Sequence, residues 1–119
     1  MTHDWPEELD ALIAAPQHHE LLFESEHVRV LDTRVAPGET VPAHTHQWPS
    51  ALYILSWSDF VRRDSDGNIL VDSRTKDASF EGQALWSAPL HLHTLENVGQ
   101  KELRAISVEM KGAVQKRAP

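Results

Sequence analysis

The stretch Gly38-Glu39-Thr40-Val41-Pro42-Ala43-His44-Thr45-His46 places two histidines two residues apart, behind a turn formed by Pro37 and Gly38. Side chains of a β-strand return to the same face at every second residue, so His44 and His46 are expected to point the same way, with Cα atoms about 6.5–7 Å apart. Two imidazoles in this arrangement can bind one metal ion if a third donor meets them. The stretch therefore predicts half of a metal site, carried on a strand.

A second pair, His91 and His93, repeats the spacing near the other end of the chain, ahead of Asn97 and Gly99. If the two strands that carry these pairs lie together, their histidines converge on one point. Taken alone, a His-x-His pair is more simply explained as two polar residues on an exposed strand face. The presence of a second pair favours a metal site.

Most of the chain has the pattern of short strands separated by turns. Apolar and β-branched runs alternate with turn sequences such as Pro37-Gly38 and Asp64 to Asn68, where Gly67 can supply a positive φ. The expected strands are 21–24, 27–35, 41–46, 51–55, 60–63, 69–72, 83–87, 90–97 and 103–110. This succession predicts an all-β sandwich or barrel.

Before the strands, Leu9, Leu12 and Ile13 fall on one helical face, and Pro16 ends the run. We therefore expect a short N-terminal helix or arm at residues 1–20, with Trp5 as its anchor, a β domain at residues 21–112 and a polar tail at residues 113–119.

Composition restricts the chemistry. The chain of 119 residues is long enough for one domain, and it contains no cysteine, so any metal ligands must be nitrogen or oxygen atoms. The net charge of −7 and the scattered basic residues argue against a nucleic-acid partner. No apolar run reaches the roughly 18–20 residues of a membrane span, and the first residues are unlike a signal peptide, so we expect a cytoplasmic protein without a membrane partner.

At the level of motifs, the sequence resembles the cupin superfamily over most of its length, from Val28 to Glu109. Its first motif has a glycine, five residues and His-x-His, and its second runs from a glycine through a proline to a histidine and then, four positions on, an asparagine. The matching residues are Gly38, His44 and His46 for the first motif and Gly82, Pro89, His93 and Asn97 for the second.

This resemblance implies a cupin-type jelly-roll β-barrel with a metal inside it, held by His44, His46 and His93. The glutamate that usually completes the ligand set should fall at Ser50 or Ala51, and it is absent. Three neutral nitrogens suit zinc, nickel or copper at least as well as iron or manganese, so we expect a divalent metal ion (Zn, Ni, Fe or Mn) whose identity stays open.

For the fourth ligand we prefer water, with His91 as the alternative because alternation places it on the same face as His93. Tyr53 is a candidate catalytic residue, since a phenol inside a barrel can position a substrate or donate a proton. Trp48, Trp57 and Trp86 are candidates to line the cavity. Glu109 and Arg34 are expected on a solvated face, and His3, His18 and His19 on the surface.

The function expected from this resemblance is a metal-dependent enzyme of dioxygenase or isomerase type that acts on a small-molecule substrate. Two alternatives stay open: a non-catalytic module that binds or senses a small ligand with a degenerate metal site, and a protein whose metal only stabilises it. The sequence does not decide whether the chain is catalytic. We also expect a homodimer, because exposed sheet edges are commonly paired or covered.

Overall fold

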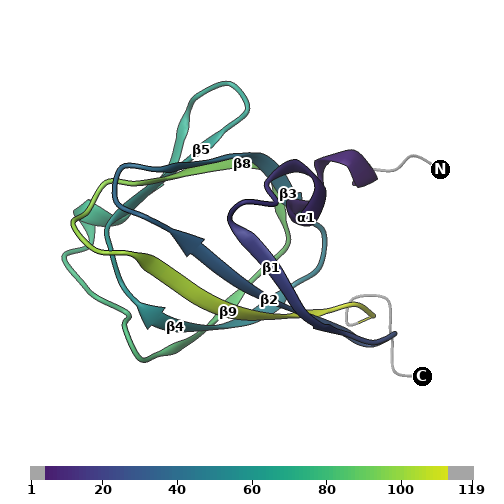
Figure 1. The fold of residues 1–119 in the computed structure, drawn as a ribbon. Coiled ribbons are helices and arrows are strands. Elements are labelled where there is room, and N and C mark those ends of the chain that lie inside the picture. Colours follow the sequence, from purple (N-terminus) through teal and green to yellow (C-terminus); the bar gives the residue numbers. More distant parts are fainter. Residues whose placement is uncertain (1–4, 113–119) are drawn as a thin grey trace.

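The computed structural model of the protein describes residues 5–112, which form two antiparallel sheets that face each other (Figure 1). One sheet has five strands in the order β1-β2-β9-β4-β7, and the other has four in the order β3-β8-β5-β6. The strands are β1 (His19–Glu24), β2 (Val28–Val35), β3 (Thr40–His46), β4 (Ser50–Ser56), β5 (Phe60–Asp64), β6 (Ile69–Asp72), β7 (Ala84–Ser87), β8 (Leu90–Asn97) and β9 (Leu103–Met110). The predicted all-β fold class is confirmed.

Strand pairing in the smaller sheet joins the two His-x-His segments. β3 and β8 run antiparallel, with His44 opposite His93 and Val41 opposite Leu95. In the larger sheet, β2 and β9 pair without interruption from Val28 opposite Met110 to Val35 opposite Leu103. Segments distant in the sequence are therefore neighbours in both sheets, as a jelly roll requires.

The expectation of a closed barrel is wrong, because the two sheets do not close into one cylinder. β1 and β7 are the edges of the larger sheet, and β3 and β6 are the edges of the smaller one. Among residues 5–112, a single isolated β-bridge lies outside these strands, and it pairs Asp10 with Thr45 in parallel orientation. The fold is thus a jelly-roll sandwich whose open edges leave room for a cavity between the sheets.

The expected N-terminal helix is present but short. It consists of a 3₁₀ turn, η1 (Glu7–Leu9), followed by α1 (Ala11–Ala14). Between them lies Asp10, whose carboxylate accepts a hydrogen bond from the backbone N–H of Leu12 at 3.0 Å and so caps α1. A second 3₁₀ turn, η2 (Ser73–Thr75), follows β6. No helix among the described residues is long and apolar enough to cross a membrane.

One predicted boundary differs from the structure, and another lies outside the described residues. The predicted arm ends later than the observed one, because His19 and Glu20 already belong to β1 and pair with β2. The predicted polar tail, residues 113–119, lies outside the described residues, as does His3.

A buried ionic network fastens the N-terminal segment to the larger sheet. The Arg29 guanidinium donates two hydrogen bonds of 3.0 Å to the Asp10 carboxylate and one of 2.7 Å to Oε1 of Glu109. Glu109 is only 1% exposed, so the expectation of a solvated position for it was wrong. Its charge is tolerated in the interior because Arg29 compensates it. Arg34, in contrast, is exposed as expected.

The network predicts a large effect of removing its cation. Arg29→Met should lower the free energy of unfolding by about 3–5 kcal/mol, because it leaves the carboxylates of Asp10 and Glu109 buried without a cationic partner. Urea denaturation followed by tryptophan fluorescence measures this change.

The matched control is Arg34→Met, which removes an arginine from the same strand. The Arg34 side chain is half exposed and pairs with Asp32, which Arg104 also binds. We expect a change of about 0–1 kcal/mol. An equal loss in both variants would contradict a special role for the buried network.

Candidate metal centre

Four imidazoles lie together between the sheets. His44 and His46 come from β3 and His93 from β8, as predicted, and His19 comes from β1 in the other sheet. The His44 ring centroid lies 4.4 Å from that of His93 and 4.9 Å from those of His46 and His19. One ligand nitrogen each from His19, His44 and His46 lies within 4.8 Å of the others. The structure thus brings the rings of His44, His46 and His93 close together, with the ring of His19 beside them.

All four rings are oriented in the same way by a hydrogen bond at Nδ1. Carbonyl and carboxylate oxygens only accept hydrogen bonds, so each Nδ1 must carry the hydrogen, and each neutral ring keeps its lone pair on Nε2. The acceptors are the carbonyl of Pro42 for His44 (2.7 Å), that of His91 for His93 (2.7 Å), that of Ala15 for His19 (2.9 Å) and Oε2 of Glu109 for His46 (3.0 Å).

The spacing of the free nitrogens fits a shared cation. Nε2 of His44 and Nε2 of His46 are 3.1 Å apart. Because both Nδ1 atoms carry hydrogen, two neutral rings would direct their lone pairs at each other. Two nitrogens bound to one ion at about 2.0–2.1 Å are roughly 2.9–3.4 Å apart in octahedral or tetrahedral geometry. A metal ion would thus satisfy this donor set.

Burial keeps three of these rings neutral. Desolvation, together with the neighbouring His46 and His93, lowers the pKa of His44 to about 2. Desolvation also lowers the pKa of His19 and of His93 to about 4, although the Nδ1 hydrogen bond of each ring partly opposes the shift. Imidazole binds metal only in its neutral form, so the lone pairs of these rings are available well below pH 6.5.

His91 lies apart from the cluster. Its side chain is exposed, and its ring stacks on Trp5 at a centroid distance of 4.5 Å. The alternation that placed it beside His93 is interrupted, because the pairing of β3 with β8 shifts register around His44. Only the backbone carbonyl of His91 serves the site, as the acceptor for His93.

Tyr53 also lies apart from the cavity. It is 46% exposed, and the β4 residues that line the cavity are its neighbours in alternation, Ser50, Leu52 and Ile54. The expectation that the phenol of Tyr53 points into the interior is therefore wrong, because the opposite face of β4 lines the cavity. Tyr53 therefore has no part in the function that we propose.

His19 is the site residue that sequence reasoning missed. It was expected on the surface, yet it is buried as the first residue of β1. The motif resemblance begins at Val28 and so gives no information on β1. Strand alternation gave no signal either, because Leu21, two residues further along, is itself exposed.

Asn97, the last residue of the second motif, has a structural role. Its side chain is fully buried and is satisfied by hydrogen bonds with Ser58, Val35, Lys101 and Gly99. These bonds fix the loop between β8 and β9 and leave Asn97 no free group for a ligand.

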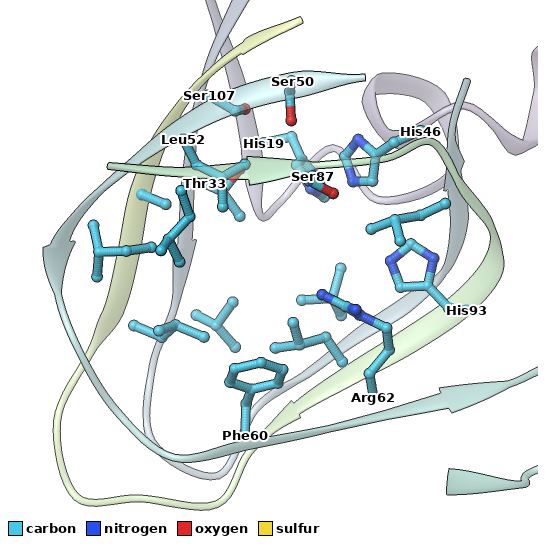
Figure 2. Close-up of a pocket in the computed structure, with 18 of the residues that line it drawn as sticks. His19, Thr33, His46, Ser50, Leu52, Phe60, Arg62, Ser87, His93 and Ser107 are labelled. Atoms are coloured by element: carbon cyan, nitrogen blue, oxygen red, sulfur yellow. The ribbon is translucent and has the colours of Figure 1, made fainter. Parts of the chain in front are cut away.

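The four histidines line a cavity of about 330 Å³ between the sheets, and Figure 2 shows His46 and His93 together at one side of it. Trp57 and Trp86 line it as expected, whereas Trp48 lies elsewhere, with its ring 5.0 Å from the Arg29 guanidinium. Most of the remaining lining is apolar, from Val35, Val41, Leu52, Ile54, Phe60, Phe80, Leu85, Leu90, Leu95, Leu103 and Ala105. A small, largely apolar molecule could therefore reach the imidazole cluster.

Comparison with family models and with curated proteins gave no match for this chain. Solved structures do match. A cupin domain from Bordetella pertussis Tohama I superposes with a TM-score of 0.60 and 17% identity, over 78% of this chain and 91% of that one. A cupin family protein with a double-stranded β-helix fold from Methanocaldococcus jannaschii gives a TM-score of 0.54 and 19% identity, over 82% and 84%. The chain has the cupin fold.

The polyketide cyclase RemF from Streptomyces resistomycificus shares this cupin fold, with a TM-score of 0.53 and 18% identity, over 89% of this chain and 70% of that one. At such identities the likeness concerns the fold alone. The resemblance seen in the two motifs is thus confirmed for the fold. In this cupin-fold chain, the missing first-motif glutamate is accompanied by an extra imidazole from His19.

The buried neutral histidines predict a loss of stability in acid. The unfolded chain binds protons near pH 6.5, whereas folded His19 and His93 bind them only near pH 4. Stability is therefore complete above about pH 6.5 and falls as the pH drops toward 4, by about 1.4 kcal/mol per pH unit for each such histidine. Urea titrations of metal-free protein at several pH values measure this slope.

His93→Gln should reduce the slope of the free energy of unfolding against pH by the contribution of one histidine, about 1.4 kcal/mol per pH unit. His27→Gln, which alters an exposed ring, should leave it unchanged. Equal slopes for the wild type and for His93→Gln would contradict the neutral, buried state of His93.

Proposed function

We propose that the protein binds one divalent metal ion through His44, His46, His93 and His19, and that it acts on a small molecule held in the adjoining cavity. One observation carries the proposal: four neighbouring imidazoles from three strands each donate Nδ1–H to an oxygen, which leaves Nε2 free on each ring, and ligand nitrogens of His19, His44 and His46 lie within 4.8 Å of one another. This pattern of oriented histidines is typical of metal sites in proteins.

A set of neutral nitrogen donors favours zinc, nickel or copper, and it accommodates iron as well. Bound there, such a metal would supply Lewis-acid or redox chemistry, which suits an isomerase or dioxygenase type of reaction. The chain contributes the surroundings. Glu109 accepts a hydrogen bond from Nδ1–H of His46 and so increases the basicity of that ligand, and the apolar lining excludes water from a bound molecule.

Metal analysis of protein purified without a histidine tag tests the site. We expect about one metal ion per chain in the wild type and none in the His44→Ala/His46→Ala double variant, because the double variant loses two adjacent donors. His19→Ala should weaken zinc binding by about 10- to 100-fold, as measured by competition with a chelator.

His91→Ala is the matched control, since it removes an exposed imidazole close in sequence to His93. Its metal content and zinc affinity should equal those of the wild type. A loss of affinity in His91→Ala with none in His19→Ala would assign the fourth ligand to His91 and contradict the ligand set proposed here. Consumption of O₂ by the metal-loaded protein, measured with candidate substrates, then distinguishes an oxygenase from an isomerase.

We further propose that the chain forms a homodimer through β1. This strand is an edge of the larger sheet, and its consecutive residues Leu21, Leu22 and Phe23 are all exposed, Phe23 by 57%. An apolar strand edge of this kind is prone to pair with another chain. A second copy that adds its own β1 would cover both exposed faces and the unpaired backbone groups.

Phe23→Glu should therefore convert the dimer into a monomer, as measured by sedimentation velocity at micromolar concentration. Ile69→Glu is the control, because Ile69 is as exposed as Phe23 but lies on β6 in the other sheet. A monomeric wild type, or dissociation by Ile69→Glu alone, would refute pairing through β1.

A further inference from the structure

Arg62 is the charged residue of the cavity that the metal site does not use. It lies on β5, where it pairs with Leu95 of β8. His93 is two residues from Leu95, so Arg62, Leu95 and His93 share one face of the sheet. Figure 2 shows its side chain rising beside Phe60, with the guanidinium directed into the cavity on the side of His93. A cation thus stands next to the imidazole cluster, within an apolar wall.

The Arg62 guanidinium has no partner within residues 5–112. Its Nε is buried and forms no hydrogen bond, and no ion pair with any described carboxylate involves it. The next residue along the strand shows the usual arrangement: Arg63 donates to Glu96 at 2.9 Å. The Arg62 guanidinium lies over the ring of Phe60, with its Cζ 5.7 Å from the ring centroid. Desolvation lowers the pKa of Arg62, and no anion opposes that shift.

The buried Nε–H of Arg62 has an energetic cost, because this group has lost water without gaining an acceptor. Buried charges in proteins are generally paired with an opposite charge. Here none of the residues that line the cavity, as far as the chain is described, is acidic. The carboxylate nearest to the cluster, Glu109, is already bound to Arg29 and His46. An anionic molecule in the cavity would supply the missing counter-charge.

The shape and polarity of the cavity define that molecule further. Its volume of about 330 Å³ admits a molecule the size of a substituted aromatic ring. Beside Arg62 the wall includes Phe60 and Leu95, with Trp57 packed against Phe60, and these side chains favour an apolar body. Carboxylate is the anionic group that a guanidinium binds with two parallel hydrogen bonds and that leaves the rest of a small molecule apolar.

We propose that Arg62 is an anion-binding residue and that the substrates are small organic carboxylates with an apolar body. The carboxylate pairs with the guanidinium, the body packs on the aromatic wall, and the molecule lies beside the four histidines. The pairing with Arg62 does not require a metal. Only the approach of the substrate to a metal ion rests on the proposed function.

The test compares acids with matched neutral amides on metal-free protein and again on zinc-loaded protein. The probes are benzoate with benzamide and 2-naphthoate with 2-naphthamide, and binding is measured by isothermal titration calorimetry. Wild-type protein should bind each acid at least about tenfold more tightly than its amide, because charge-assisted hydrogen bonds form only with the acid. Arg62→Met should abolish this preference.

Arg63→Met is the matched control, since it removes the same charge from the neighbouring position, where Glu96 already pairs with it. It should keep the preference for acids. Arg62→Met is expected to fold, because methionine fills the same space without a desolvated charge. Its thermal midpoint, measured in parallel, should equal or exceed that of the wild type, and benzoate should raise the midpoint of the wild type and of Arg63→Met but not that of Arg62→Met.

Equal affinities for acids and amides in the wild type, no saturable binding of either acid, or an unchanged preference in Arg62→Met would each overturn the proposal. Tighter binding of inorganic phosphate than of both acids would also overturn it, by assigning the residue to a different class of anion. Failure of the metal site leaves a distinct result: the acid preference persists in metal-free protein while the protein binds no zinc. If the Arg62 proposal fails while the metal site exists, the protein binds zinc but binds acids and amides with equal affinity.

Discussion

The antiparallel pairing of β3 with β8 is the constraint on which the site depends. It sets His44 opposite His93, and so brings together two segments separated by half of the chain. The local shift of register around His44 then determines which side chains enter the cavity: Val41, His44 and His46 on one strand, and Leu90, His93 and Leu95 on the other. A ladder without that shift would have carried a different set of residues inward.

The sequence was sufficient for the elements that local chemistry specifies. Turn residues and alternating apolar runs located the nine strands to within a few residues, and the two His-x-His pairs indicated the convergence of His44, His46 and His93. Both signals are short-range: a turn glycine or a strand period is readable within ten residues. The resemblance to cupin motifs supplied the jelly-roll architecture, which such signals do not specify.

What could not be predicted depends on contacts across the fold. Whether Tyr53 or its neighbours in β4 face inward depends on pairing with β9 and β7, and either parity is compatible with the sequence of that strand. The burial of Glu109 requires Arg29, a residue 80 positions away, as its partner. His19 lies before the motifs, on a strand whose place opposite β3 only the assembled sandwich reveals.

Glu109 uses its two oxygens for different purposes, Oε1 for Arg29 and Oε2 for His46. Through Arg29 and Asp10 it reaches the cap of α1, and Ala15, just beyond that helix, holds the ring of His19. A metal ion bound at the imidazoles, as proposed, would therefore be thermodynamically linked to docking of the N-terminal segment, and each would favour the other to the same extent. Proteases should then cleave peptide bonds near α1 more slowly in metal-loaded protein. Cleavage of this segment would thus report whether the histidine site is occupied.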